Sequence, residues 1–344
     1  MTPLLSIRGL RTWFYTESGV AKAVDGVDLD IHEGEVLGLV GESGSGKSVT
    51  ALSILRLIPD PPGRIVAGQV LYRGRDLLQA SWDEIRAMRG SDISMVFQEP
   101  MTSLNPVFTI GMQVTEVILA HEPASADEAH RRAVDILTEV GIADAAARMT
   151  QYPHHLSGGQ RQRVMIAMAL VLNPSLVIAD EPTTALDVTI QAQILDLMLQ
   201  MKARRAGASI LLITHNLSVV AETCDRVAVM YGGKIQEVAP VRALFAEPLH
   251  PYTQGLLGSI PGVDGSKARR LTVIPGSVPD IHDLPAGCKF VTRCPKRFEP
   301  CEGTEPPLIE HAPGQWVRCH LYGAGGAGGG RRAGAADPAH PADI

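Results

Sequence analysis

The sequence predicts an α/β fold, and the evidence is three apolar runs at residues 36–40, 176–181 and 209–213, the second of which ends in two acids. Each run is short and uninterrupted, which is typical of a strand that is covered on both faces in a parallel sheet. Residues 49–57 and 186–204 follow the first two runs, and their apolar content predicts helices. Because parallel strands end at one edge of a sheet, the polar residues after these runs mark the expected site.

The composition fits a globular protein with one large unit and a smaller one. The chain has 344 residues, of which 45% are hydrophobic and 20% charged, and a net charge of −6. This charge gives no general electrostatic reason to bind nucleic acid or an anionic membrane. The longest apolar run, residues 164–172, is far shorter than the roughly 18 to 20 residues that span a bilayer. Residues 1–14 lack the pattern of a secretory signal, so we expect a cytosolic location and reduced thiols, unless these hold a metal.

The first polar segment, residues 41–48, has the sequence GESGSGKS and fits the phosphate-binding pattern G-x-x-x-x-G-K-[ST] at every fixed position. Gly41, Gly44 and Gly46 would let the backbone curl so that its N–H groups form a nest for phosphate oxygens at a helix N-terminus. Lys47 is then positioned to reach the β and γ phosphates, and the Ser48 hydroxyl to ligate Mg²⁺. The alternative is a glycine-rich turn with an exposed lysine.

The second and third runs end in Asp180-Glu181 and in Thr214-His215. The Asp180 carboxylate is positioned to hold Mg²⁺ directly or through water, and Glu181 to orient or deprotonate an attacking water. Acids at strand ends are also common solvated caps, and a lone histidine after a strand is usually structural. These interpretations therefore depend on the phosphate-binding segment upstream.

The remaining elements follow in chain order. Residues 4–14 and 20–31 are predicted as two strands joined by a turn, which places Phe14 and Tyr15 ahead of the phosphate loop. An aromatic side chain there either stacks on a nucleotide base or packs in a small sheet. Further strands are predicted at 68–72 and 91–97, and a helical region from 109 to 147. Residues 156–160, LSGGQ, then begin another helix.

Five elements therefore occur in one order: GESGSGKS, Gln98, LSGGQ, LVIADEP at residues 176–182, and His215. Together they resemble the ATP-binding subunits of ABC transporters, over roughly residues 4–240. The resemblance implies a P-loop NTPase of ABC type with a RecA-like core, a small antiparallel β subdomain and a helical subdomain at about residues 100–165. We expect this ATP-binding domain to span residues 1–240.

The resemblance also implies a role for each matching residue. Glu181 would be the catalytic base, His215 the switch histidine, and Gln98 would contact Mg²⁺ and the membrane partner. Phe14 would stack on adenine, with Tyr15 as the alternative. The remaining ATP contacts would come from Gly41, Ser43, Gly44, Ser45, Gly46, Lys47, Ser48 and Asp180, and from the signature and D-loop residues Ser157, Gly158, Gly159, Gln160 and Asp187. Ser48, Gln98 and Asp180 would hold Mg²⁺, and the signature would act on ATP bound to the opposite subunit.

Segments outside this catalytic set narrow the resemblance. Residues 22–27, 97–106, 250–253 and 274–279 are similar to the dipeptide and oligopeptide importers, a group that also includes nickel importers. This implies two membrane permease subunits, a second ATPase subunit that is either a paralogue or a copy of this chain, and an extracytoplasmic binding protein. The chain would then lie on the cytoplasmic face of the membrane. A soluble ABC ATPase outside transport is the alternative class.

Four of the five cysteines lie close together in a C-terminal extension at residues 241–322: Cys288, Cys294, Cys301 and Cys319. The segment is rich in Pro and Gly and offers little apolar material for a core, so a bound metal would supply order. Four thiolates suit a [4Fe–4S] cluster or Zn²⁺, and free thiols or a disulfide are the other possibilities. The resemblance to peptide importers favours the cluster. Cys224 is expected to be a core residue, and residues 323–344, rich in Gly and Ala, to be disordered.

Overall fold

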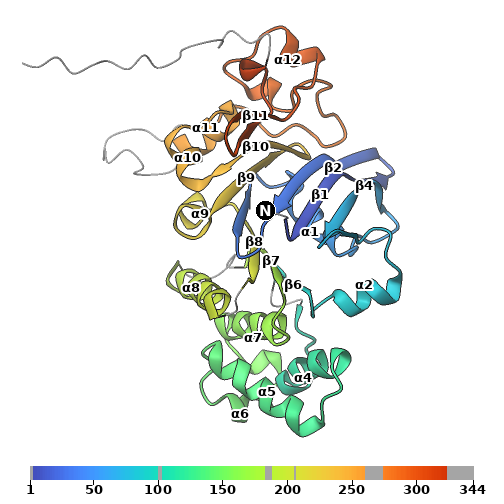
Figure 1. Ribbon diagram of the computed structural model, residues 1–344, viewed down its shortest axis with the longest axis vertical. Coiled ribbons are helices and arrows are strands. Elements are labelled where there is room, and N and C mark those ends of the chain that lie inside the picture. The colour runs from blue at the N-terminus through green and yellow to red at the C-terminus, as the bar shows by residue number, and fades with distance from the viewer. Residues whose placement is uncertain (1–2, 100–102, 183–187, 205–206, 260–273, 324–344) are drawn as a thin grey trace, which may run out of the picture.

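The computed structural model describes residues 3–99, 103–182, 188–204, 207–259 and 274–323. A large sheet runs through its centre in the order β11-β12-β10-β9-β3-β8-β7-β6 (Figure 1). Its strands are β3 (Val36–Val40), β6 (Ile93–Val96), β7 (Leu176–Asp180), β8 (Ser209–Thr214), β9 (Arg226–Tyr231), β10 (Lys234–Pro240), β11 (Ile309–Ala312) and β12 (Gln315–Val317). The strands from β9 to β6 pair in parallel, whereas β10, β11 and β12 pair antiparallel. The predicted α/β class is thus confirmed.

The apolar runs that predicted this sheet are covered on both faces. Along β3, Leu37 and Leu39 pack into one core cluster, whereas Val36 and Val40 pack into another. The first cluster also includes residues of the small antiparallel sheet and of helix α1 (Lys47–Ile54). The second includes residues of the helices on the opposite face, so every side chain of this strand is buried. This is the reason that β3 reads as a continuous apolar run rather than an alternating one.

The small sheet has the strand order β2-β1-β4-β5, with β1 (Leu5–Thr16), β2 (Gly19–Ile31), β4 (Gly63–Tyr72) and β5 (Arg75–Asp76). The predicted hairpin of the first two strands is confirmed. Strand β4 begins earlier than the predicted residue 68, because it pairs with β1 from Phe14↔Gly63 to Leu5↔Tyr72. Helix α2 (Trp82–Met88) follows this sheet.

The helical region lies at the end of the molecule opposite the C-terminal extension (Figure 1). It contains α4 (Ile110–His121), α5 (Ala126–Glu139), α6 (Ala145–Arg148) and α7 (Gly158–Leu170). Helix α5 buries one face, through Ala129, Ala133, Ile136 and Leu137. The other helices are α8 (Val188–Arg204), α9 (Leu217–Thr223), α10 (Val241–Ala246), α11 (Pro251–Gly258) and α12 (Pro300–Gly303). Among the residues that the structure describes, no helix has both the length and the apolar composition of a membrane span.

The C-terminal extension differs from the expectation that it would have little core. Its hairpin, β11 and β12, pairs with β10 and so continues the large sheet. Phe290 and Val291 are buried in the same cluster as residues of β9 and α11. The extension is therefore ordered by sharing the core of the larger unit rather than by building its own. Cys224 is buried, as predicted, and the tail from residue 324 onward lies outside the described residues.

Candidate active site

The phosphate loop joins β3 to α1, as predicted, and its glycines adopt backbone conformations that other residues rarely take. The φ angles of Gly41, Gly44 and Gly46 are 154°, 77° and 106°. A Cβ atom on Gly46 would lie 2.3 Å from the carbonyl oxygen of Ala23 in β2, and one on Gly41 would lie 2.1 Å from that of Met230 in β9. The loop is therefore pressed between two strands at positions where only glycine fits.

Lys47 is folded back over this loop. Its ammonium donates to the carbonyl oxygens of Gly41 at 2.9 Å and Glu42 at 3.0 Å, and lies 3.4 Å from Ser45 Oγ. Burial lowers the pKa of Lys47, and the nearby carboxylates of Glu181, Asp180 and Glu42 oppose that shift. A buried cation whose hydrogen bonds go to oxygen atoms of the loop is suited to exchange them for phosphate oxygens.

Ser48 and Asp180 meet beside the loop. The Ser48 hydroxyl donates to Asp180 Oδ1 at 3.1 Å, which joins the start of α1 to the end of β7. Burial raises the pKa of Asp180, and the nearby Glu181 carboxylate adds to this shift, whereas the Ser48 hydroxyl and the Lys47 ammonium oppose it. A hydroxyl and a carboxylate side by side are oxygen ligands of the kind that Mg²⁺ prefers.

Glu181 lies at the centre of the remaining predicted residues. Its carboxylate accepts a hydrogen bond from Gln98 Nε2 at 3.1 Å, and His215 Nδ1 lies 3.3 Å from its other oxygen. Gln98 follows β6 and His215 follows β8, so three strand ends supply this group. Glu181 itself has a φ of 45°, a conformation that costs about 1–3 kcal/mol outside glycine and that clusters at active sites. The backbone N–H of Glu181 is bonded to Ile213 O at 2.9 Å.

The aromatic residues ahead of the loop lie on β1. Phe14 is half-buried, pairs with Ala21 of β2, and its ring packs toward Gly63 of β4. Tyr15 is 49% exposed. The hairpin that carries both aromatic residues also reaches the loop, because the Ala23 carbonyl oxygen of β2 faces Gly46.

The signature residues begin helix α7 and form hydrogen bonds among themselves. The Ser157 hydroxyl accepts from the backbone N–H of Gln160, and Gln160 Oε1 accepts from the N–H of Ser157, which is a capping box. Ser157 and Gly158 are exposed. The helix is tied to the turn after β7 by Gln162 Nε2, which donates to Pro182 O at 2.6 Å. Asp187, predicted for the D-loop, lies outside the described residues.

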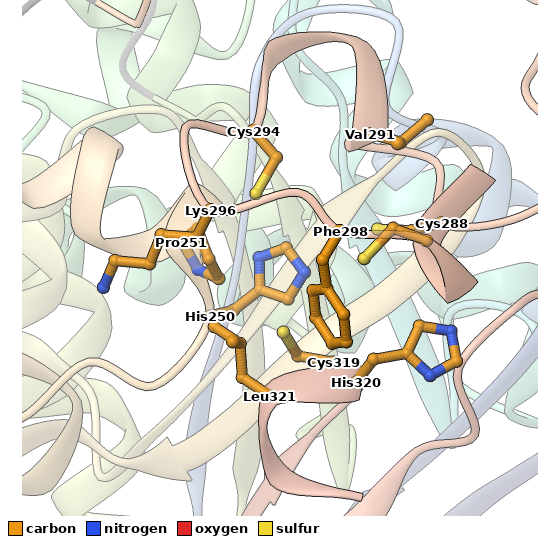
Figure 2. Close-up of a pocket in the computed structure, with 11 residues that line it drawn as sticks. His250, Pro251, Cys288, Val291, Cys294, Lys296, Phe298, Cys319, His320 and Leu321 are labelled. Carbon is orange, nitrogen blue, oxygen red and sulfur yellow. The ribbon is translucent and has the colours of Figure 1, made fainter. Parts of the chain in front are cut away.

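The four C-terminal cysteines line one pocket, together with His250, Phe298 and His320. Figure 2 shows the sulfur atoms of Cys288, Cys294 and Cys319 directed toward the space beside the His250 and Phe298 rings. Backbone bonds from Gly287 to Glu302 and from Cys288 to Cys301 hold two segments of this pocket together. Burial raises the pKa of Cys288 to about 11 and that of Cys319 to about 12.

This donor set suits a thiolate-bound metal or cluster, because four thiols from one chain line one pocket, three of them buried and Cys294 half-buried. Their arrangement does not form a metal site. Within the described ranges, no group of three or more His, Cys, Asp or Glu side chains is placed to hold a metal ion. The four cysteines expected to bind an iron–sulfur cluster, or Zn²⁺ as the alternative, therefore share a pocket, but among the described residues they are not arranged to coordinate a metal. The nearby histidines have other contacts: the His311 ring meets the Tyr322 ring edge-on, and His320 Nε2 lies 2.8 Å from Thr304 O.

Two contacts of the phosphate loop come from the C-terminal extension, and both involve Glu42. Arg293, next to Cys294 in the sequence, forms an ion pair with Glu42, and the hydroxyl of Tyr252 accepts from the Glu42 backbone N–H at 2.8 Å. Tyr252 lies in the HPYT segment that resembles peptide importers, which is the only signal in the sequence that points to it. No sequence pattern points to Arg293, because its partners Glu42 and Tyr231 lie far from it in the sequence.

Comparison with known proteins supports the same assignment. The family described as "ABC transporter" matches residues 24–184, and the "Oligopeptide/dipeptide transporter, C-terminal region" matches residues 236–301. The chain is 52% identical over 327 residues to the oligopeptide transport ATP-binding protein AppD of Bacillus subtilis (strain 168), which covers 95% of this chain and 99% of that protein. It is 47% identical over 321 residues to the dipeptide transport ATP-binding protein DppD of the same organism, covering 93% and 95%.

Among solved structures, the ATP-binding cassette MJ0796, a dimer in a post-hydrolysis state bound to ADP and Pi, is similar. The TM-score is 0.62 at 27% identity, covering 69% of this chain and 99% of that one. The loop, the two acids at the end of β7, and the glutamine and histidine that contact Glu181 define an ATP-binding cassette, an ATPase. The chain belongs to the ABC transporter family of ATP-hydrolysing subunits, in the group that carries the oligopeptide/dipeptide transporter C-terminal region.

Proposed function

We propose that this ATPase drives the uptake of dipeptides or oligopeptides through a membrane importer. The observation that carries the proposal is the joint presence of the assembled ATP site and the C-terminal region, in a chain that matches peptide-transport relatives over almost its whole length. Nickel import by the same kind of assembly is the second candidate, because the transported molecule does not touch an ATPase subunit. A soluble ABC ATPase outside transport is the third.

In this proposal, the backbone N–H groups of residues 41–48 and the Lys47 ammonium bind the ATP phosphates. Ser48, Asp180 and Gln98 would hold Mg²⁺, and the ion would supply positive charge for the transferred phosphoryl group. Glu181 removes a proton from the attacking water, and His215 orients that carboxylate from 3.3 Å away. Phe14 stacks on the adenine. The support is the convergence of these side chains at the ends of β6, β7 and β8.

A second ATPase subunit completes the site. Ser157, Gly158, Gly159 and Gln160 stand at the exposed start of α7, where backbone N–H groups and the helix dipole favour an anion. We assign this surface, with Asp187, to the ATP that is bound on the opposite subunit. The dimeric state of the similar cassette MJ0796 supports this arrangement. The second subunit is a paralogue or another copy of this chain.

The permease-binding surface is assigned to four exposed apolar side chains that adjoin Gln98 or follow it closely in the sequence. Phe97, Val107, Phe108 and Met112 are 40%, 71%, 41% and 54% exposed. Large apolar groups gathered on a surface mark an interaction site more often than scattered ones do. With two permeases docked here, the chain lies on the cytoplasmic face of the membrane, and an extracytoplasmic binding protein delivers the substrate to the permeases.

The four cysteines at 288, 294, 301 and 319 would hold a [4Fe–4S] cluster in this proposal, with Zn²⁺ as the alternative. When bound, such a group cross-links the segments that line the pocket and keeps the thiols deprotonated. The thiol side chains must move together to ligate it. Protein purified without air should contain about four irons and four sulfides per chain. Iron-free protein that contains zinc would support the alternative, and protein with neither would contradict both.

The ATPase assignment is tested by Glu181→Gln. We expect the variant to bind ATP with unchanged affinity and to lose turnover by a factor of about 100 to 10,000, since it lacks the base. Glu222→Gln, an exposed glutamate on α9, is the matched control and should behave as the unchanged protein. Unimpaired turnover in Glu181→Gln would refute the role of this residue.

The transport assignment is tested in reconstituted membranes that contain the co-purifying permeases and binding protein. Peptides should stimulate ATP turnover and accumulate inside the vesicles. Stimulation by Ni²⁺ alone would favour the second candidate. A protein that co-purifies with no permease would favour the third.

A further inference from the structure

The ion pair between Arg293 and Glu42 joins the C-terminal extension directly to the phosphate loop. Arg293 Nη1 lies 2.5 Å from Glu42 Oε2, and Nη2 lies 3.1 Å from Oε1, so the contact is bidentate. The Arg293 side chain is only 5% exposed. Its Nε donates to Pro275 O at 3.1 Å, and its guanidinium carbon lies 5.9 Å from the ring centroids of Tyr231 and Phe290. It is therefore a fixed, buried group and not a mobile surface arginine.

The same loop residue is held a second time through its backbone. The Tyr252 hydroxyl accepts the N–H of Glu42, and the Tyr252 ring is fully buried against Tyr231 and Phe290, with centroid distances of 4.6 Å and 5.3 Å. Tyr231 follows Met230, whose carbonyl oxygen leaves no room for a Cβ on Gly41. The extension thus fixes both the main chain and the side chain of Glu42 from behind the loop.

Glu42 is the one acid within GESGSGKS, a segment that must receive a polyanion. An unpaired carboxylate at this position would repel phosphate and would compete for Lys47, whose ammonium already donates to the Glu42 carbonyl oxygen. Glu42 is part of the electrostatic surroundings of Lys47, together with Asp180 and Glu181. The Glu42 side chain is 28% exposed, so the protein encloses it only in part, and the two hydrogen bonds from Arg293 fix the position of its carboxylate.

We propose that Arg293 is a positioning residue of the nucleotide site: it neutralises Glu42 and keeps its carboxylate away from Lys47 and from the phosphates. Arg293 acts through Glu42 and does not itself touch ATP. The C-terminal extension thereby completes the phosphate loop of the same chain. This inference rests on the proposed function, because it assumes that the loop binds ATP.

The test measures the affinity of the full-length chain for a non-hydrolysable ATP analogue with Mg²⁺, and the KM and kcat of ATP turnover. Arg293→Ala should raise Kd and KM about tenfold while kcat changes less than about twofold. Glu42→Gln in the Arg293→Ala background should restore Kd to within about twofold of the unchanged protein, because the repelling charge is gone. Arg297→Ala, an exposed arginine of the same segment, is the matched control.

Rescue by Glu42→Gln separates this role from structural support, which the second substitution would not restore. The affinity loss of Arg293→Ala should also shrink as ionic strength is raised. If Arg293→Ala does not fold, Arg293→Lys carries the test: it keeps the charge without the two-point geometry and should weaken binding by about threefold or less.

An unchanged Kd in folded Arg293→Ala, or a double variant as weak as the single one, would overturn the inference. Failure of the unchanged protein to bind ATP would instead overturn the proposed function.

Discussion

The phosphate loop and the C-terminal extension are built in opposite ways. The loop consists of eight consecutive residues whose backbone forms the site, with glycines wherever a side chain would collide with β2 or β9. The extension is fixed by charged and aromatic side chains that meet across the chain: Glu305 lies 2.9 Å from Lys234, 3.4 Å from Arg318 and 3.5 Å from Lys289. The difference shows that a local motif can be recognised in the sequence, whereas contacts between distant parts of the chain are visible only in three dimensions.

The largest effect expected from this comparison is that of Gly46→Ala. The new Cβ would lie 2.3 Å from Ala23 O at a φ of 106°, so the loop must deform. We expect ATP affinity to fall more than about a hundredfold, because the backbone N–H groups that bind phosphate are displaced. Equilibrium binding of ATP to the purified chain is the measurement.

Gly44→Ala is the matched control for that experiment. Gly44 also has a positive φ, 77°, but a Cβ there meets nothing within 4 Å. Only conformational strain remains, of about 1–2 kcal/mol. If the two substitutions weakened binding equally, close packing against β2 would not be what shapes the loop.

The next effect concerns the extension, through Glu305→Gln. This change removes the charge shared by Lys234, Lys289 and Arg318, whose side chains are 7%, 10% and 10% exposed. Burial already lowers the pKa of Arg318, which shows how poorly its charge is solvated. We expect the free energy of unfolding to fall by about 2 kcal/mol, a value reduced because Glu305 is 31% exposed. Denaturant unfolding of the full chain measures it.

Glu302→Gln, an exposed acid of the same segment, is the control and should unfold like the unchanged protein. Equal stability of the two variants would mean that the extension is held by the hairpin pairing with β10 alone.

The same contrast explains what could be predicted from the sequence. The central strands are predictable because both of their faces are buried, and the site residues because of their places at the strand ends: Asp180 ends β7, whereas the loop, Glu181 and His215 directly follow β3, β7 and β8. The order of the extension is not apparent from the sequence. It comes from strand pairing with β10 and from packing on Tyr231, and neither contact leaves a periodic pattern of apolar residues. For the same reason, the spacing of the four cysteines marks Cys294 in the sequence, whereas nothing marks the adjacent Arg293.

The smallest expected effect concerns the start of α7, which is built locally like the loop but is assigned a role on another chain. Ser157 caps α7 and Ser81 caps α2, in both cases with a capping box. Ser157→Ala and Ser81→Ala should therefore each lower the free energy of unfolding by about 1 kcal/mol. By that measure the two serines are equivalent.

They differ only if Ser157 also contacts the ATP of the opposite subunit. ATP turnover of the assembled ATPase should then fall by roughly tenfold in Ser157→Ala, which loses one hydrogen bond to the phosphate, and should be unchanged in Ser81→Ala. ATP affinity of the isolated chain should be the same in both, because Ser157 is not part of its own phosphate loop. Equal turnover in the two variants would reduce Ser157 to a helix cap, and the pairing of two subunits around ATP would have to rest on other residues.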